Sequence, residues 1–485
     1  MTKRLRFLFL CLLVALSGYT IFMAPVALGQ DRSAPPSLGP PPELELPPIE
    51  KRTLSNGVGV WIVEHHEVPL VQVNLVIAAG SGADPAGKYG LASLTAAMLD
   101  EGAGSRSALQ LADAIEFLGA VLTTSSSFDA SGVRLNVPRA RLEDALPLMA
   151  DVALRPTFPP AELERLRKER LTALLQAKED PASIGPLAFS RILYGETHRY
   201  GTSALGTETT LQAFTTADLQ AFHRSMYQPS NATLVVAGDI AADAVVPQLE
   251  KHFGSWRGSS TATRPAAVPT ASQPEQSQIY IVDMPGAEQS VIRIGWVGVA
   301  RSSPDYFPLQ VLNTVLGGSF TSRLNQNLRE THGYTYGASS GFDMRLSAGP
   351  FSARANVQTD KTAEALREFF NELNAIAKPI PADELEKANS FVALGFPGQF
   401  ETIGDLSAQL EELIVYGLPE TYFERYVANI RAVTAADVQK AATTYIQPDR
   451  FAIVIVGDRK VIEPGIRALN LAPVRVMTIE EAVGS

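Results

Sequence analysis

The sequence is almost free of cysteine, the residue that forms disulfides and thiolate metal sites. Among 485 residues the single cysteine is Cys11, which lies in an apolar N-terminal segment. If that segment is removed, the protein has no thiol, no disulfide and no cysteine-ligated metal. With 46% hydrophobic and 19% charged residues, the composition is that of a globular protein that can bury large cores. We therefore expect the fold to be held together by side-chain packing.

Histidine is also scarce, with six residues in the chain. His65 and His66 are neighbours in a predicted turn, so their rings point apart. The other four are His198, His223, His252 and His332. None of these has a second histidine four residues away, the spacing that brings two rings to one helical face. We interpret all six as surface or structural histidines.

The first 29 residues resemble a targeting segment rather than part of a domain. A basic start, MTKRLR, precedes a long apolar run, and small residues at Ala27 and Gly29 suit a cleavage site. This pattern predicts a secretory signal peptide and an exported, periplasmic protein. The alternative is an uncleaved N-terminal membrane anchor, because the run approaches spanning length. Polar, glycine and proline residues interrupt the run, which favours cleavage.

The chain also has fewer basic than acidic residues. Removal of the segment takes away Lys3, Arg4 and Arg6 and moves the net charge from −10 to −13. An acidic surface argues against nucleic acid or anionic lipid as a partner.

Composition shifts divide the rest of the chain. The predicted divisions are a Pro-rich, extended and solvated lead-in (30–49), an N-terminal domain (50–257), a flexible Pro/Ser/Thr/Ala-rich linker (258–275) and a C-terminal domain (276–485). In the N-terminal domain the apolar runs 59–63 and 70–78 indicate an antiparallel pair of strands. The elements expected next are helices from about residue 88 and at 109–118, strands at 121–126 and 132–137, and helices at 141–153 and 161–178.

An internal repeat links the two domains. TTADLQAFHRSMYQPSNATLVVAGD (Thr215–Asp239) stands 219 residues before TAADVQKAATTYIQPDRFAIVIVGD (Thr434–Asp458), with nine identities at that fixed offset. Each copy predicts a threonine N-cap, a helix, a Gln-Pro stop and a buried strand ending in Gly-Asp. A weaker echo pairs residues 160–166 with residues 381–388. The repeat predicts two related α+β halves, and such halves usually enclose a ligand cleft.

Two motifs point to a known family. LSNGVGVWIVEHHEVPLVQVNLVIAAGSGAD (Leu54–Asp84) is similar to the opening strands of that family's fold. VLGGSFTSRLNQNLRETHGYTYGASS (Val315–Ser340) is similar to the Gly-rich turn, helix and strand in the second half of that fold. On these motifs the chain resembles the pitrilysin/insulinase family of zinc metallopeptidases, in its short branch related to mitochondrial processing peptidase. The resemblance covers roughly residues 54–458. It implies an α+β fold of two homologous metallopeptidase-like halves, each an antiparallel-rich sheet packed with helices, that form a clamshell.

The zinc-binding positions implied by this resemblance contain no ligands here. The family's helix carries His-x-x-Glu-His, in which two histidines grip Zn²⁺ and the glutamate takes a proton from its water. In GLASLTAAMLDEGA the two histidine positions fall on Ser93 and Ala97, and the glutamate position on Ala96. The third ligand position falls on Gln176, although Glu169, seven residues earlier, is retained. We expect no cofactor in this chain.

The corresponding second-half helix, residues 309–318, offers no substitute site. Its side chains near the equivalent places are those of Gln310, Asn313 and Thr314.

The resemblance also implies a role for an arginine and a tyrosine seven residues apart. In paired short-branch peptidases, the chain without zinc keeps these residues and extends them toward the substrate carbonyl on its partner. The matching residues here are Arg329 and Tyr336, in RETHGYTY. A guanidinium and a phenol can stabilise the oxyanion of a hydrated amide. Structural roles are the alternative for both residues, and Tyr334 is the alternative phenol.

The sequence therefore predicts a non-catalytic subunit of an exported heteromeric zinc metallopeptidase. Its expected partner is a homologous, zinc-bearing chain, and its expected substrates are unfolded or extended peptides. The alternative is a peptide-binding or scaffold protein on the same fold. A self-sufficient hydrolase is disfavoured, because the sequence has no histidine cluster and no cysteine other than Cys11.

Overall fold

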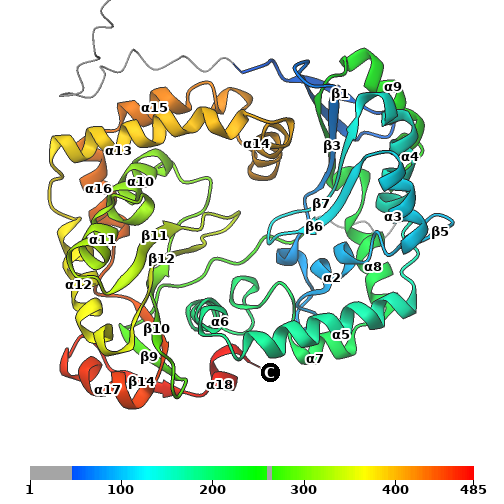
Figure 1. Cartoon of the computed structure of the whole chain (residues 1–485). Helices are drawn as coiled ribbons and strands as arrows, with labels where there is room; N and C mark the ends of the chain where they lie inside the picture. The colour runs from blue at the N-terminus through cyan, green and yellow to red at the C-terminus, as the bar shows by residue number, and fades with distance from the viewer. Residues whose placement is uncertain (1–45, 259–264, 485) are drawn as a thin grey trace, which may run out of the picture. The chain divides into compact units, whose positions relative to one another are not determined.

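Two six-stranded sheets with covering helices form the protein (Figure 1). The structure is a computed structural model that describes residues 46–258, the first half, and 265–484, the second half. The predicted signal peptide and most of the lead-in lie outside these residues. Within them, no helix combines the length and apolarity needed to cross a bilayer.

The first half contains strands β1 (Glu50–Thr53), β2 (Gly59–Glu64), β3 (Leu70–Ile77), β4 (Gly102–Ala103), β5 (Arg106–Ser107), β6 (Val121–Ser126), β7 (Ser131–Pro138) and β8 (Ala232–Gly238). Its α-helices are α2 (Leu91–Ala97), α3 (Ala108–Phe117), α4 (Leu142–Leu154), α5 (Pro160–Ala177), α6 (Pro181–Tyr194), α7 (Glu208–Ala213), α8 (Thr216–Met226) and α9 (Ala242–Phe253). Most predicted helices and strands are confirmed to within a few residues.

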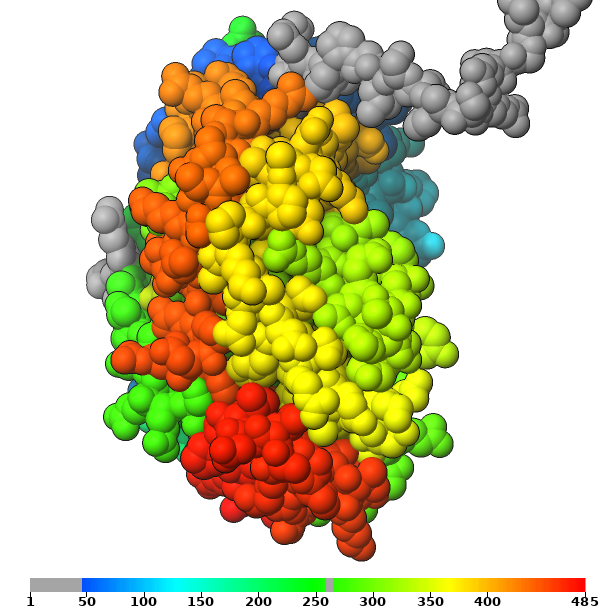
Figure 2. Space-filling view, turned by 90° about the vertical axis from the view of Figure 1, so that its left-hand side faces the viewer, coloured from blue at the N-terminus to red at the C-terminus, as the bar shows by residue number. Residues whose placement is uncertain are grey.

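The second half contains strands β9 (Gln278–Asp283), β10 (Gln289–Val297), β11 (Thr335–Phe342), β12 (Pro350–Gln358), β13 (Ala452–Gly457) and β14 (Val474–Met477). Its α-helices are α10 (Tyr306–Asn313), α11 (Arg323–Asn325), α12 (Thr362–Ala375), α13 (Ala382–Gly395), α14 (Ile403–Tyr416), α15 (Tyr426–Ala432), α16 (Ala435–Tyr445), α17 (Arg459–Ala468) and α18 (Ile479–Val483). Figure 2 shows the side of the molecule where segments from yellow to red, α12 and α17 among them, form much of the surface.

The strand orders of the two sheets correspond. The order is β1-β2-β8-β3-β7-β6 in the first half and, read in the opposite direction, β14-β9-β13-β10-β12-β11 in the second. In both, the last strand of the sequence repeat lies at the centre and runs parallel to the opening strand, as β8 does with β2 and β13 with β9. The predicted direct pairing of β2 with β3 is wrong, because β8 lies between them and bonds both.

The helix starts of the repeat are confirmed in atomic detail. Thr215 caps α8 by accepting from the Asp218 backbone N–H, and Thr434 caps α16 by accepting from that of Asp437. Each helix start is a capping box, in which the aspartate side chain in turn accepts from the threonine backbone N–H. Two donors that a helix start would leave unpaired are thus satisfied in both halves.

The two halves each place one helix on the other half's sheet. Helix α6 of the first half packs against β10 and β13, and α14 of the second half packs against β3 and β8. Both helices end in Tyr-Gly. The Tyr194 hydroxyl donates to the Ala348 carbonyl between β11 and β12, at 3.1 Å. The Tyr416 hydroxyl donates to Asp129 between β6 and β7, at 3.2 Å.

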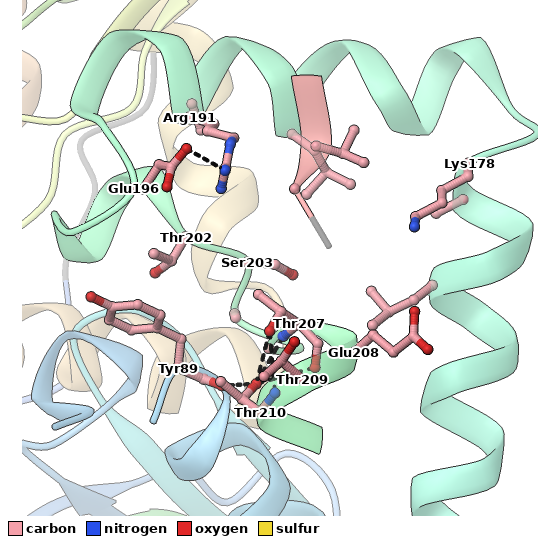
Figure 3. Close-up of a pocket in the computed structure, with 18 of the residues that line it drawn as sticks. Tyr89, Lys178, Arg191, Glu196, Thr202, Ser203, Thr207, Glu208, Thr209 and Thr210 are labelled. Carbon is pink, nitrogen blue, oxygen red and sulfur yellow. Dashed lines mark hydrogen bonds and ion pairs between the residues drawn. The ribbon is translucent and has the colours of Figure 1, made fainter. Parts of the chain in front are cut away.

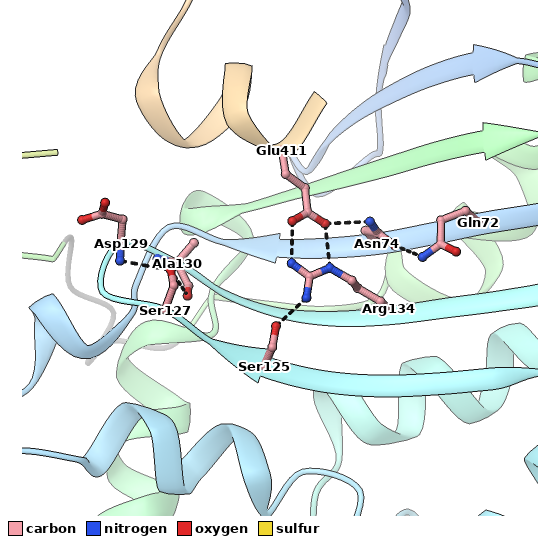
Figure 4. Close-up of polar contacts among 8 residues, drawn as sticks. All are labelled: Gln72, Asn74, Ser125, Ser127, Asp129, Ala130, Arg134 and Glu411. Carbon is pink, nitrogen blue, oxygen red and sulfur yellow. Dashed lines mark hydrogen bonds and ion pairs between the residues drawn. The ribbon is translucent and has the colours of Figure 1, made fainter. Parts of the chain in front are cut away.

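The contact of α14 with the first sheet is polar at its centre (Figure 4). Glu411 accepts from Arg134 of β7 through two bonds, at 3.0 and 2.6 Å, and from the Asn74 amide of β3 at 2.6 Å. Arg134 also donates to the Ser125 hydroxyl of β6 at 2.5 Å. The carboxylate and the guanidinium are therefore matched in charge and hydrogen bonding.

The lead-in and the linker are more tightly packed than expected. Leu46 and Ile49 are partly buried against the core of the second half, so the prediction of a solvated segment is wrong for these residues. In the linker, the Gln273 side chain bonds the backbone of Val297. The Pro269 carbonyl lies 2.8 Å from His198.

Candidate functional site

Helix α2 has kept its packing and lost its ligands. Leu91 and Leu94 are buried in the core of the first half, and Ala96 is 1% exposed. Ser93 and Ala97 are partly exposed, and neither can replace an imidazole as a metal ligand. In the described residues, no group of three His, Cys, Asp or Glu side chains is placed to hold a metal ion. The residues at this place do not fit zinc.

An arginine that the sequence analysis overlooked binds to this helix. Arg170 of α5 donates from Nη2 to the Ser93 carbonyl at 2.9 Å, while its Nη1 is buried and has no partner among the residues that the structure describes. Burial lowers the pKa of Arg170 to about 10, which still leaves a cation at neutral pH. A guanidinium bonded next to the former ligand positions would repel a divalent metal ion.

The two family positions on α5 point to solvent. Glu169 is exposed and lies 3.4 Å from Arg165, its partner one turn earlier. Gln176 is exposed as well. Within the described residues, neither is hydrogen-bonded or ion-paired to α2, so Glu169 belongs to the charged outer face of the helix.

The start of α2 depends on a buried acid. Asp84 accepts from the backbone N–H groups of Gly90 at 2.7 Å and Ala92 at 2.8 Å. Gly90 has φ +92°, and a Cβ there would lie 2.6 Å from Gly206, so only glycine fits. Burial raises the pKa of Asp84 to about 7, against the lowering effect of the two N–H bonds.

Arg329 lies on a π-helical turn, Gln326–Thr331, in the second half. Its guanidinium carbon lies 4.5 Å from the ring centre of Phe320, which is 61% exposed. Its Nε lies 3.3 Å from Glu330, and 36% of the side chain is accessible. The arginine is thus supported by an aromatic face and still open to solvent.

Tyr336 lies on the edge strand β11 and is 89% exposed. The ladder between β11 and β12 is interrupted between Thr335 and Ala338, so Tyr336 lies in a bulge. Bulges of this kind redirect side chains out of a sheet. Tyr334, in contrast, stacks on His332 at 5.0 Å and packs against the core, which gives it a structural role.

A buried amide joins the segments that present these two residues. Asn325, 4% exposed, donates to the Phe320 carbonyl at 2.6 Å and accepts from the Ala338 backbone N–H at 3.1 Å. The second bond satisfies a backbone donor of the edge strand β11. The support of Arg329 and the strand of Tyr336 are thereby fixed to each other.

A cavity of about 790 Å³ lies in the first half, between α5, α6 and residues 201–210 (Figure 3). Leucines of α5 form one wall, and hydroxyl groups from Thr202 to Thr210 line another. Arg191 and Glu196 pair at its rim, and Val483 and Gly484 reach it from the end of the chain. The cavity includes none of the predicted site residues, and no sequence motif indicated it.

Comparison with known proteins places this architecture in a family. Residues 60–199 match the model of the insulinase family (peptidase family M16), and residues 213–391 match that of the peptidase M16 inactive domain. The chain belongs to this family, as a peptidase-like member without the zinc-binding side chains.

Individual relatives agree with that assignment. An uncharacterized zinc protease of Mycobacterium bovis is 26% identical over 417 residues, covering 84% of this chain and 92% of its own. The non-peptidase homologue YmxG of Helicobacter pylori is 22% identical over 408 residues, covering 83% and 92%. The structure of a peptidase M16 inactive domain from Pseudomonas fluorescens superposes with a TM-score of 0.79 at 27% identity, covering 84% and 98%.

Proposed function

We propose that this chain is a non-catalytic subunit of an exported heteromeric zinc metallopeptidase. It would pair with a zinc-bearing homologue and contribute Arg329 and Tyr336 to peptide-bond hydrolysis. The observation that most supports this proposal is the contrast between the two family sites. The zinc-type helix holds no ligand, whereas the arginine and the tyrosine are retained and open to solvent.

The chemistry needs both groups at the surface. Zinc in the partner would supply the activated water and polarise the scissile carbonyl. Arg329 and Tyr336 would donate hydrogen bonds to the oxygen that becomes negative as water adds. Phe320 already supports the guanidinium of Arg329, and the β11 bulge fixes the backbone from which Tyr336 projects.

Extended peptides would bind by adding a strand to an open edge. Strands β6 and β11 are the outer strands of their sheets, and Val121 at the start of β6 is 60% exposed. The edge of β6 offers backbone donors and acceptors to any extended chain, whatever its sequence, whereas on β11 the Ala338 N–H is already bonded to Asn325. Export to the periplasm is proposed from residues 1–29 alone, and an uncleaved segment would anchor the subunit to the membrane.

A peptide-binding or scaffold protein without a catalytic role is the second candidate. Arg170 beside α2 favours it, because a cation at this place opposes metal binding in addition to the missing ligands. A relative named as a non-peptidase homologue is also consistent with it. On this reading Arg329 and Tyr336 are dispensable.

Reconstitution with a zinc-bearing homologue from the same genome would separate these candidates. Peptidase activity and metal content would be measured for each chain alone and for the mixture. We expect cleavage only by the mixture, a kcat lowered at least tenfold by Arg329→Ala or Tyr336→Phe, and no effect of the matched control Tyr334→Phe. If the homologue alone cleaves as fast as the mixture, this chain is a scaffold. Stoichiometric zinc in this chain would contradict both candidates.

A further inference from the structure

The inner face of the second sheet carries two arginines without an acid. Arg293 of β10 and Arg354 of β12 are direct cross-strand partners, so their side chains lie on the same face. Within the described residues, neither arginine forms an ion pair. Arg293 Nε is buried with no hydrogen-bond partner. Arg354 is exposed and uses only Nε, which donates to Ser339 on β11 at 3.0 Å.

The equivalent place in the first sheet shows what is missing. There, Asn74 of β3 and Arg134 of β7 are cross-strand partners, and Arg134 donates to Ser125 on the edge strand. Glu411 of the covering helix α14 neutralises the arginine. The second sheet repeats the arginine and the serine, replaces the asparagine with Arg293, and lacks the carboxylate.

The covering helix of the second sheet explains the lack. If α6 and α14 are aligned on their terminal Tyr-Gly, Phe189 corresponds to Glu411. Phe189 is 2% exposed and packs over Gly295. At Gly185 the helix passes directly over the arginine, since a Cβ there would lie 3.7 Å from Arg293 Nε. No carboxylate of α6 reaches the pair.

Two adjacent guanidinium groups without a counter-ion are unfavourable by themselves. Like charges directly opposite on a sheet repel, and burial together with Arg354 lowers the pKa of Arg293 to about 10. An anion placed between them would relieve the repulsion and satisfy the free donors. Planar guanidinium forks match a carboxylate especially well.

We propose that Arg293 and Arg354 form a binding site for a carboxylate of an extended peptide. Ser339, which orients Arg354, lies on β11 three residues from Tyr336. A peptide lying across this face beside β11 would therefore place an acidic group a few residues from the atoms that Tyr336 reaches. The site selects peptides by charge. Its peptide ligand rests on the proposed function, whereas the anion recognition requires neither a partner chain nor catalysis.

The test uses the purified chain alone and measures binding by calorimetry. The probes are a seven-residue Ser/Thr/Val peptide with blocked ends and a central glutamate, the same peptide with glutamine, the glutamine peptide with a free C-terminal carboxylate, and inorganic phosphate. We expect the glutamate peptide to bind at least tenfold more tightly than the blocked glutamine peptide in 50 mM salt. The difference should shrink in 500 mM salt, because the Debye length falls. Binding of the free-terminus peptide instead would assign the site to chain ends.

The variants Arg354→Gln and Arg293→Asn should each remove the preference for glutamate. Arg293→Asn restores the residue type of the first sheet, and the exposed Arg354 can be changed without disturbing the core. Arg475→Gln, an exposed arginine on β14 at the opposite edge, is the matched control and should bind like the unchanged chain. Equal binding of the two blocked peptides, a preference that survives Arg354→Gln, or binding of phosphate alone would overturn the proposal. Absence of a zinc-bearing partner would overturn the proposed function and leave this result intact.

Discussion

The helix that covers the first sheet brings an acid to the polar residues beneath it, whereas the helix that covers the second sheet brings a phenylalanine. Glu411 neutralises Arg134, whereas Arg293 faces Gly185, and Phe189 packs over the neighbouring Gly295. The backbone arrangement is shared, so the difference comes from a few side chains. In the first half the arginine on the sheet is paired with a carboxylate, and the zinc-type helix carries no metal ligand. The second half keeps charged and aromatic groups open to solvent, and any shared chemistry should therefore depend on it.

The largest effect should come from Asp84, which holds the start of α2. Its pKa of about 7 in the folded protein exceeds that in the unfolded chain, so between these values the folded state binds the extra proton. Stability should then fall as pH rises from about 4 to 7, by at most about 1.4 kcal/mol per pH unit, and level off above 7. Urea unfolding across this pH range measures the slope.

Asp84→Asn and Asp84→Ser are the matched controls, because neither side chain titrates. Both variants should lose this part of the slope, so their stability difference from the unchanged chain varies with pH. A difference that stays constant from pH 4 to 7 would show that the two backbone N–H groups keep Asp84 ionised.

Removing the carboxylate that α14 supplies should have the next largest effect. Glu411→Gln leaves Arg134 and Asn74 without their charged acceptor, and bonds to charged groups contribute about 1.5–3 kcal/mol. Partial exposure of Arg134 places the expected loss near the lower value. Thermal unfolding measures it. Ala408→Gln, which adds a glutamine at an exposed position of the same helix, is the control for the helix itself.

A combined Arg134→Gln and Glu411→Gln variant should recover part of the loss, since no unpaired charge remains. If Glu411→Gln is as stable as the unchanged chain, the polar contact between α14 and the first sheet contributes little.

Much of this comparison was accessible from the sequence, because the signals are local. The capping boxes at Thr215 and Thr434, the Gln-Pro stops and the buried strands repeat in order, and they predicted two related halves. It was harder to predict which strands lie next to each other in the sheet. The placement of β8 between β2 and β3 depends on a segment more than 150 residues further along the chain. No local pattern encodes such an insertion.

Some site residues were not predicted from the sequence for the same reason, which is that their roles depend on distant segments. Arg170 and Arg293 have ordinary neighbours in the sequence, and Asp84 ends a family motif that assigns it no role. The importance of all three comes from their packing beside another element. Arg329 and Tyr336 were found because a family motif contains them. Only the structure shows that Phe320 and Asn325 support the segments that present them. Comparison of Phe189 with Glu411 likewise requires the packing of α6 and α14.

Smaller, matched effects should come from the repeated caps. Thr215→Ala and Thr434→Ala each remove an acceptor for a backbone N–H at a helix start, which costs about 1 kcal/mol. The two sites lie in different halves, so their effects should add within about 0.5 kcal/mol in the double variant. Hydrogen exchange at α8 and α16 measures each separately. Unequal costs would show that only one half depends on its cap.

The smallest effect on stability is expected from Arg354→Gln, the counterpart of Arg134→Gln. Arg354 is exposed and gives up one bond to Ser339, so its loss should change stability by less than about 0.5 kcal/mol. Removal of a cation facing Arg293 should even offset that loss in low salt. Arg134→Gln, in contrast, leaves the partly buried Glu411 without its charged partner and should be clearly destabilising. Thermal unfolding of the two variants in 50 and 500 mM salt compares the sheets directly. Equal losses would mean that Arg354 has a structural partner like that of Arg134, and that its charge is not free to bind a ligand.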